Sequence, residues 1–234
     1  MNPRTLHILC AGAAQGLVKA LQPALAAETG ASVSGRFGAV GAMKEALLAG
    51  EPCDLMVVTD KMVAELVANG ALRAEGRAPL GRVRTGVAVR DGAPMPDTAT
   101  PEGLKAALLA AEAIYFPDPQ RATAGIHFAN VMRELGIHDQ LAPRFRTFPN
   151  GATAMRELAA STAPGQIGCT QVTEINYTEG IRLVGPLPQR FELATVYTAA
   201  VASQAADPGL AARFIAMLAG AESQDLRSAG GFED

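Results

Sequence analysis

The feature that most constrains this chain is a repeated alternation of short apolar runs with apolar residues at helical spacing. The run 6–10 ends at small residues, and Leu17, Leu21 and Leu25 then recur at helical spacing until Gly30. Short continuous apolar runs that alternate with helices are typical of parallel strands, whose crossovers are right-handed. The alternation therefore predicts the α/β class, with doubly wound sheets.

The alternation falls into two units, with a proline- and glycine-rich segment at 91–96. The strands that we expect are 6–10, 32–37, 54–58, 85–90, 113–116, 145–148, 166–171 and 194–202. Helices are expected after the first two strands and at 61–69, 101–111, 124–135, 152–160, 208–218 and 221–229. Gly30, Gly50 and Gly70 are expected to end the helices of the first unit.

The composition limits the class of partner. The 234 residues are 49% hydrophobic, which is enough for one large core or two small ones. Aromatic residues make up only 5%, Trp is absent, and the formal net charge is -3. With neither a basic run nor a stacking platform for bases, nucleic acid is not expected as a partner. No apolar stretch approaches the roughly 20 residues that cross a bilayer, so membrane insertion is not expected either.

The three cysteines, Cys10, Cys53 and Cys169, are odd in number and far apart. This pattern predicts reduced, buried thiols rather than a disulfide framework or a metal site. The sequence contains no serine nucleophile elbow, Walker loop, zinc-ligand cluster or dinucleotide fingerprint. We therefore expect no metal and no cofactor.

The N-terminal residues Met1–Thr5 run directly into the first apolar run, without a charged segment, a longer apolar segment or a small-residue cleavage site. These features predict a cytoplasmic protein. The alternative is a periplasmic protein whose signal peptide has been removed and replaced by a methionine.

In open α/β sheets, ligands bind beyond the carboxyl ends of the strands, where helices begin. Most residues at these positions are small, and the backbone N–H groups of a helix N-terminus attract anions. The candidate ligand-binding residues are Ala11, Gly12, Ala13, Ala39, Val40, Gly41 and Thr59 in the first unit, and Arg121, Thr123, Ala124, Gly125, Asn150, Gly151, Ala152, Thr170 and Gln171 in the second. The alternative is that small residues stand there only because turns require them.

Four segments stand out when these loops are taken in order: FGAVG at 37–41, AGEPCDLMVV at 49–58, PDP with TAGIHF between 117 and 128, and QIGCTQ at 166–171. Together they resemble the molybdate-binding protein family, which has the type II periplasmic solute-binding fold. The resemblance covers nearly the whole chain. It implies two lobes around a cleft, joined by crossing strands at 84–90 and 194–202, with hinge closure over the ligand. The expected lobes are 1–84 with 195–234, and 85–194.

The chain departs from this family at the first two loops. Molybdate sites in the family present serine or threonine hydroxyls there, whereas the matching segments 11–13 and 39–41 contain none. An oxyanion bound at these loops would lose several charge-assisted hydrogen bonds, each worth roughly 1.5–3 kcal/mol. We therefore expect an organic carboxylate rather than molybdate.

Three residues are candidates for specific roles. If Thr123 caps its helix, His127 lies one turn inside, and the positive helix end would keep its imidazole neutral as a general base requires. Glu174 is a second candidate proton acceptor, and Arg121 could pair with a ligand carboxylate in bidentate fashion. The alternatives are a packed or surface histidine, an acid that favours a helix start, and a solvated loop charge.

Two functions from different classes follow. The first is a binding module that holds a small anion, an organic carboxylate, and delivers it to a transporter permease or a regulatory partner. The resemblance includes aconitate isomerase, which implies the second: a cytoplasmic, cofactor-independent isomerase that shifts a proton in a polycarboxylate. A transport component that binds molybdate or another oxyanion is a third possibility.

Overall fold

The computed structural model describes residues 4–234. Residues 1–3, on which the expectation about an export signal partly depends, lie outside the described part. The chain divides into two compact units: unit 1 comprises the residues up to Arg82 together with Thr195–Asp234, and unit 2 comprises Val83–Ala194. The chain leaves unit 1 within strand β4 (Ala78–Arg90) and returns at the start of β9 (Ala194–Val201).

The sheet of unit 1 has the strand order β2-β1-β3-β9. Strand β1 (Thr5–Ala11) pairs in parallel with β2 (Ser32–Gly38) and with β3 (Leu55–Thr59), and β9 pairs antiparallel with β3. The parallel strands are joined by helices, as the alternation of the sequence predicts. The α/β class is therefore confirmed.

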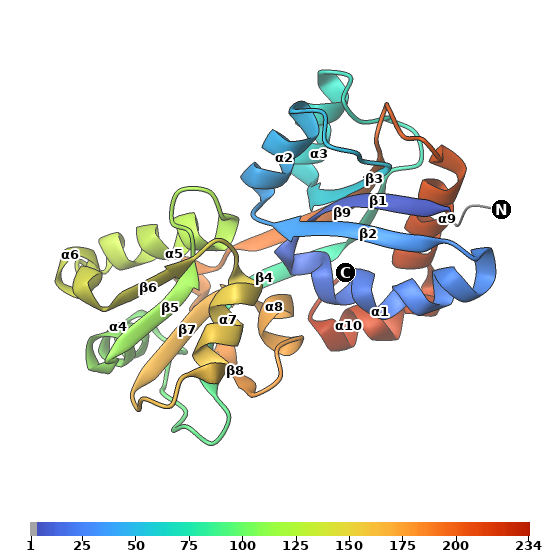
Figure 1. Cartoon of the computed structure of the whole chain (residues 1–234). Coiled ribbons are helices and arrows are strands. Elements are labelled where there is room, and N and C mark those ends of the chain that lie inside the picture. Colours follow the sequence, from blue (N-terminus) through green and yellow to red (C-terminus); the bar gives the residue numbers. More distant parts are fainter. Residues whose placement is uncertain (1–3) are drawn as a thin grey trace. The chain divides into compact units, whose positions relative to one another are not determined.

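Helices cover both faces of this sheet (Figure 1). They are α1 (Gly12–Thr29), α2 (Val40–Leu48), α3 (Asp60–Ala68), α9 (Pro208–Ala219) and α10 (Gln224–Gly230), with a short 3₁₀ helix at Ala221–Ser223. Helix α1 contacts α9 and α10, whereas α2 and α3 lie on the other face. Gly30 ends α1 in the left-handed conformation at φ 69°, as expected.

The sheet of unit 2 has the strand order β8-β4-β7-β5-β6. Strand β5 (Ala113–Pro117) is parallel to β6 (Phe145–Phe148) and β7 (Gln166–Gln171), and β4 is antiparallel to both β7 and β8 (Ile181–Pro186). The helices are α4 (Pro101–Ala110), α5 (Thr123–Glu134), α6 (His138–Leu141), α7 (Gly151–Ala160) and α8 (Val172–Asn176), with 3₁₀ helices at Ala142–Arg144 and Gln189–Phe191.

Alternate residues of β5 enter two separate cores in unit 2. Ile114 and Phe116 join the apolar cluster under α4 and α5, where the rings of Phe116 and Phe128 meet edge to face with centroids 5.5 Å apart. Ala113 and Tyr115 join the cluster under α7. This two-residue alternation places a core on each face of the sheet.

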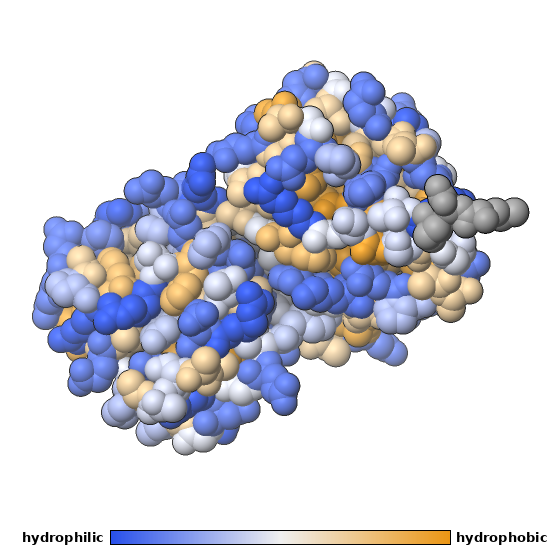
Figure 2. All heavy atoms as spheres, in the orientation of Figure 1, coloured by the Kyte–Doolittle hydropathy of each residue, from blue (hydrophilic) through white to orange (hydrophobic). Residues whose placement is uncertain are grey.

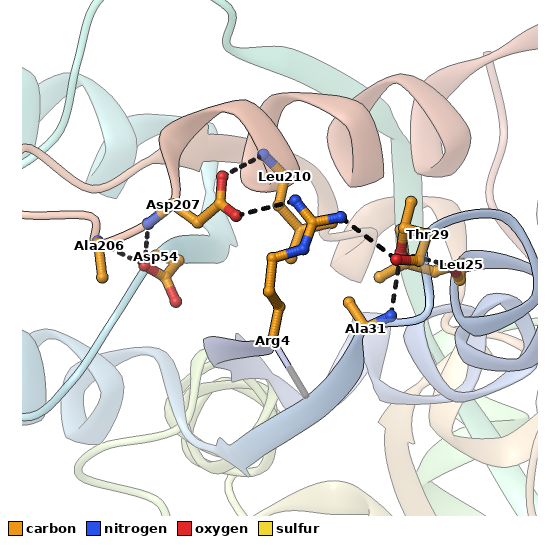
Figure 3. A network of polar contacts seen from close by, with 8 residues as sticks. All are labelled: Arg4, Leu25, Thr29, Ala31, Asp54, Ala206, Asp207 and Leu210. Atoms are coloured by element: carbon orange, nitrogen blue, oxygen red, sulfur yellow. Dashed lines mark hydrogen bonds and ion pairs between the residues drawn. The ribbon is translucent and has the colours of Figure 1, made fainter. Parts of the chain in front are cut away.

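Unit 1 contains a buried carboxylate that joins three segments, and Figure 3 shows its bonds to the segment before α9. Asp54, just before β3, accepts hydrogen bonds from the backbone N–H groups of His7 (2.8 Å), Ala206 (2.7 Å) and Asp207 (3.2 Å). Asp207 in turn caps α9 by accepting from the N–H of Leu210 at 2.9 Å. The network fixes the start of α9 against β1 and β3.

Besides shifts of a residue or so at element ends and the unpredicted short helix α6 and 3₁₀ helices of unit 2, the structure differs from the expected elements in four places. Strand β4 begins at Ala78 rather than at residue 85, and the expected helix 221–229 is a 3₁₀ turn followed by α10. Strand β8 and the short helix α8 were not predicted. Each depends on pairing or packing with distant residues, because β8 is held by the antiparallel ladder with β4 and α8 packs on α7 and β8.

The visible surface is mostly hydrophilic, with small apolar patches between charged and polar residues (Figure 2). Few large hydrophobic side chains are exposed, and the most exposed of them is Leu48 at 55%. Within residues 4–234, no helix combines the length and the apolar character that a bilayer crossing requires.

Candidate functional site

The first two helices of unit 1 begin at the carboxyl ends of their strands with backbone groups alone. Ala11 precedes α1 and Ala39 precedes α2, and neither side chain caps its helix. Gly12, Ala13 and Val40 are buried in the first turns. The first N–H groups of a helix have no partner within the helix, so these ends favour an anion. Gly41 follows Val40 in α2 and is partly buried.

The third helix of unit 1 is different. The hydroxyl of Thr59 accepts a hydrogen bond from the N–H of Met62 at 3.3 Å, so it is used as a helix cap. Asp60 adds a negative charge to the same turn and accepts a hydrogen bond from Thr198 at 2.9 Å. A helix N-terminus that already holds a carboxylate is a poor place for a second anion. Among the expected loops of unit 1, those of α1 and α2 are therefore the more suitable.

Helix α5 of unit 2 begins at Thr123, one residue earlier than the expected start at 124. Thr123 is the first helical residue and does not cap the helix, which corrects the premise used to place His127; Ala122, with extended backbone angles, is the N-cap. Arg121 is exposed in the preceding turn, where its N–H donates to Asp118 Oδ1 at 3.2 Å.

The small residues after Thr123 serve close packing. Ala124 and Gly125 are both buried. A Cβ atom at Gly125 would lie 2.3 Å from the carbonyl oxygens of Pro117 and Asp118. Packing of the helix against the end of β5 thus requires a glycine here, independently of any role in ligand binding.

His127 is half-buried on α5, with Nε2 2.7 Å from the carbonyl oxygen of Phe191. Because a carbonyl only accepts, Nε2 donates in this contact, and in the neutral tautomer Nδ1 is then the acceptor. This hydrogen bond fixes the orientation of the ring. A catalytic imidazole needs such an orienting partner on its second nitrogen. A general base at this position would have to act through Nδ1.

The N-terminus of α7 is occupied by a carboxylate of the protein itself. Asn150 caps the helix by accepting from the N–H of Thr153 at 2.8 Å. Glu174 Oε1 accepts from the N–H of Ala152 at 3.2 Å, and Oε2 accepts from the hydroxyl of Thr170 at 2.5 Å. A side chain at Gly151 would collide with both, because its Cβ would lie 1.9 Å from Thr170 Oγ1 and 2.0 Å from Glu174 Oε2.

Burial raises the pKa of Glu174 above its ordinary value, and the hydrogen bonds from Thr170 and from the backbone N–H groups of Ala152, Gln171 and Gly151 partly oppose this rise. The N–H of Gln171 belongs to the N-cap of α8, and Glu174 is the third residue of that helix. Glu174 therefore closes the ends of α7 and α8 together, in the manner of a capping box. Asn150, Gly151, Ala152 and Thr170 are brought together, but around Glu174.

Three buried side chains in unit 2 have polar atoms without a hydrogen-bond partner among residues 4–234. They are Thr85 (Oγ1), Gln171 (Nε2 and Oε1) and Thr173 (Oγ1). All three are at most 2% exposed. Buried polar groups in folded proteins are nearly always hydrogen-bonded, so these atoms are candidates for contact with an ordered water or a ligand. Of the three, only Gln171 was expected from the sequence.

Thr85 and Thr173, which the sequence analysis did not single out, have only weak signals in the sequence. Thr85 is the first residue of the run Thr85–Arg90 and carries its one hydroxyl, ahead of an apolar stretch that ends at Arg90. Thr173 lies between Gln171 and Glu174, whose spacing of three is that of a capping box. Neither signal by itself indicates a contact with a ligand. The position of Thr85 beside Gln171 becomes known only from the pairing of β4 with β7.

The cysteines are free and buried. Burial raises the pKa of Cys53 to about 12 and raises those of Cys10 and Cys169 as well, so none is a reactive thiolate at neutral pH. Within residues 4–234, no group of three or more His, Cys, Asp or Glu side chains is placed to hold a metal ion.

Comparison with known proteins gives results over nearly the whole chain. The family described as bacterial extracellular solute-binding protein matches residues 6–233. An aconitate isomerase from a Pseudomonas species is 26% identical over 224 residues, which cover 92% of this chain and 82% of that protein.

Two solved structures show the fold. The periplasmic molybdate-binding protein of Azotobacter vinelandii superposes with a TM-score of 0.80 at 20% identity, covering 98% of this chain and 99% of that one. A sulfate-binding protein of Mycobacterium tuberculosis has a TM-score of 0.74 at 19% identity, covering 98% and 86%. The expected periplasmic binding protein fold and the resemblance to molybdate-binding proteins are confirmed.

Proposed function

The chain belongs to the bacterial extracellular solute-binding protein family, and from this we propose that it binds a small organic carboxylate and delivers it to a membrane permease or a regulatory partner. The structural relatives named for molybdate and sulfate support an anion as the ligand. The word periplasmic in the name of the Azotobacter protein supports the periplasmic alternative over the cytoplasmic one.

The observation that carries the choice of a carboxylate is the chemistry of the first turns of α1 and α2. Both helices begin with alanine, glycine or valine, and neither has a side-chain cap. A tetrahedral oxyanion held there would receive only backbone N–H groups. A planar carboxylate needs fewer donors, and two or three carboxylates on one molecule can be shared between helix ends.

Unit 2 carries a candidate carboxylate contact of its own, at the start of α5. Arg121 is exposed beside the start of α5, and its guanidinium has the fork geometry that matches a carboxylate. The N-terminus of α7 is already filled by Glu174. We therefore place the carboxylate of the ligand at α5 and Arg121, not at the loop 150–152.

A thermal-shift screen of molybdate, tungstate, sulfate and a set of di- and tricarboxylates tests this proposal. A carboxylate at 100 times its dissociation constant should stabilise the protein by about 2.7 kcal/mol, which raises the melting temperature by several degrees. Arg121→Ala should remove most of this shift, whereas Arg133→Ala, at the exposed other end of α5, should leave it intact. Stabilisation by molybdate or tungstate alone would contradict the proposal in favour of oxyanion transport.

A second candidate is an isomerase that moves a proton in a polycarboxylate. The aconitate isomerase relative supports it, as does the fixed imidazole of His127 with Nδ1 as its acceptor. The bond to Phe191 would orient the ring, and helix N–H groups would stabilise the negative charge that develops when a proton leaves carbon. This activity needs the same carboxylate site, so both candidates share the binding step.

A further inference from the structure

We propose that Thr85 and Gln171 form a subsite in unit 2 for a hydroxyl group of the ligand, so that the ligand is a hydroxycarboxylate. The inference rests on the proposed function, because it names a further group of the same ligand. It starts from two buried side chains whose polar atoms have no partner among residues 4–234.

The register of the sheet places these two side chains together. Thr85 on β4 is the antiparallel partner of Gln171 on β7, and Val87 is the partner of Cys169. Side chains of directly opposed residues lie on the same face, and alternate residues share that face. Val87 and Cys169 belong to the apolar cluster that α5 covers. The row therefore changes from apolar to polar at the last residue of β7, on the face of α5.

The backbone N–H and carbonyl groups of Thr85 are hydrogen-bonded, and the unpaired atoms are those of the two side chains. The N–H of Thr85 donates to the carbonyl of Leu193 at 3.0 Å, and its carbonyl accepts from Leu187 at 3.0 Å. Thr85 is 1% exposed and Gln171 is 2% exposed. Bulk water does not reach these atoms, and leaving them unpaired is unfavourable.

The chemistry of the pair selects the group that would satisfy it. The carboxamide of Gln171 offers donors at Nε2 and an acceptor at Oε1, and the hydroxyl of Thr85 can do either. An ionised oxyanion has only acceptors, so it would leave Gln171 Oε1 unpaired. A ligand hydroxyl can donate to Oε1 and accept, through its two lone pairs, from both Nε2 and the Thr85 hydroxyl, which gives each of the three unpaired atoms a partner.

The start of α5 lies at the same edge of the sheet. Strand β5, which precedes α5, is parallel to β7, so their carboxyl ends share one edge. A carboxylate at the first turn of α5 and a hydroxyl at Gln171 would thus be two groups of one small molecule.

Titration calorimetry with two pairs of acids that differ by a single hydroxyl tests the subsite: malate against succinate, and citrate against tricarballylate. In the wild type, the hydroxylated member of at least one pair should bind about 10- to 100-fold more tightly, because the other member leaves buried polar groups unpaired. Thr85→Val and Gln171→Leu should each reduce that preference to about threefold or less.

Thr147→Val is the matched control, since Thr147 is exposed on β6, and it should keep the full preference. Without ligand, Thr85→Val should melt no lower than the wild type, because it removes an unpaired hydroxyl. Equal binding within both pairs, or a preference that survives both variants, would overturn the subsite and leave the carboxylate proposal standing. Failure of all four acids to bind would overturn the carboxylate proposal and the subsite together.

Discussion

Asp54 is buried at the start of β3, and its carboxylate accepts three backbone N–H groups from two other segments of unit 1. A small chain of contacts continues from it through Asp207 to Arg4, whose guanidinium also reaches the carbonyl of Thr29 (Figure 3). Asp54 does for the inside of unit 1 what Glu174 does for unit 2: each supplies the negative charge that surrounding N–H groups need.

Asp54→Ala should lower the free energy of unfolding by about 3–5 kcal/mol, because three backbone N–H groups lose the buried carboxylate as their acceptor at once. Urea denaturation followed by circular dichroism measures the change. Asp225→Ala, at an exposed position on α10, is the control and should cost no more than about 0.5 kcal/mol. A loss below 1 kcal/mol in Asp54→Ala would mean that water replaces the carboxylate.

His127 tests the isomerase candidate. His127→Gln should cut the exchange of aconitate protons with D₂O, followed by NMR, by about 10²–10⁴-fold, since glutamine can donate to Phe191 but cannot act as a base. Aconitate affinity should change much less, because a base acts mainly in the transition state. The absence of exchange in the wild type over a day argues against an isomerase. Full exchange in the variant would exclude His127 as the base and direct attention to Glu174.

At the scale of elements, the ends of the helices divide into two kinds. Helices α3 and α7 each have a side-chain cap and a nearby acid, which is Asp60 in the first turn of α3 and Glu174, from outside the helix, at α7. Helices α1 and α2 have neither a cap nor an acid in the first turn. This division separates helix ends that are complete within the protein from the ends that we propose as ligand contacts. Among the filled helix ends, that of α7 should depend on pH, because the Glu174 carboxylate that fills it is buried and its pKa is raised.

Burial raises the folded pKa of Glu174 above its ordinary value of 4.5, so the folded protein binds this proton more tightly than the unfolded chain. Its contribution to stability is present below about pH 4.5 and is lost as the pH rises through the raised pKa. The free energy of unfolding of the wild type minus that of Glu174→Gln should therefore fall between pH 4.5 and 8. Urea denaturation at a series of pH values measures this difference.

Glu157→Gln, exposed on α7, is the control and should give a difference that hardly changes over the same range. Between the two pKa values the slope should approach about 1.4 kcal/mol for each pH unit. A difference that rises with pH would mean that hydrogen bonding, rather than burial, dominates at Glu174.

The sequence predicted most elements because their signals are local. Strands β6 and β7 have the expected bounds, since each is an apolar or alternating run between a turn and a helix start. The missed β8 is recognisable only through its ladder with β4, which contains an irregularity between Val87 and Ala88. Its local signal is short, because only Ile181, Arg182 and Leu183 alternate before Val184 and a glycine.

The candidate site was predictable in part. The loops at the carboxyl ends of strands follow from the alternation alone. The alternation does not show which helix ends are already occupied by a side chain of the protein. That depends on side chains from other elements, such as Glu174 beside Gly151. Thr85 is the sharpest case: its relation to Gln171 depends on the register of two strands whose sequences lie far apart.

At the scale of the whole molecule, unit 2 is one continuous segment and unit 1 is not. The fragment 83–194 contains the strands of its sheet and two apolar cores, so it should fold alone and unfold cooperatively on heating. The fragment 1–82 lacks β9, α9 and α10 and should not. Circular dichroism and NMR dispersion of the two fragments measure this. A disordered fragment 83–194 would mean that its cores need unit 1.

The division of unit 1 between the two ends of the chain also sets an order of events on the ribosome. Strand β3, whose residues Leu55, Met56, Val57 and Val58 are fully buried in the finished protein, receives its neighbour β9 only about 135 residues later. At about 5–20 residues per second, translation leaves this apolar edge without its partner for on the order of 7–27 s. Unit 2 emerges and can close within that interval. We therefore expect the nascent N-terminal third to be the part most prone to aggregation, and slowing translation after residue 59 should increase aggregation.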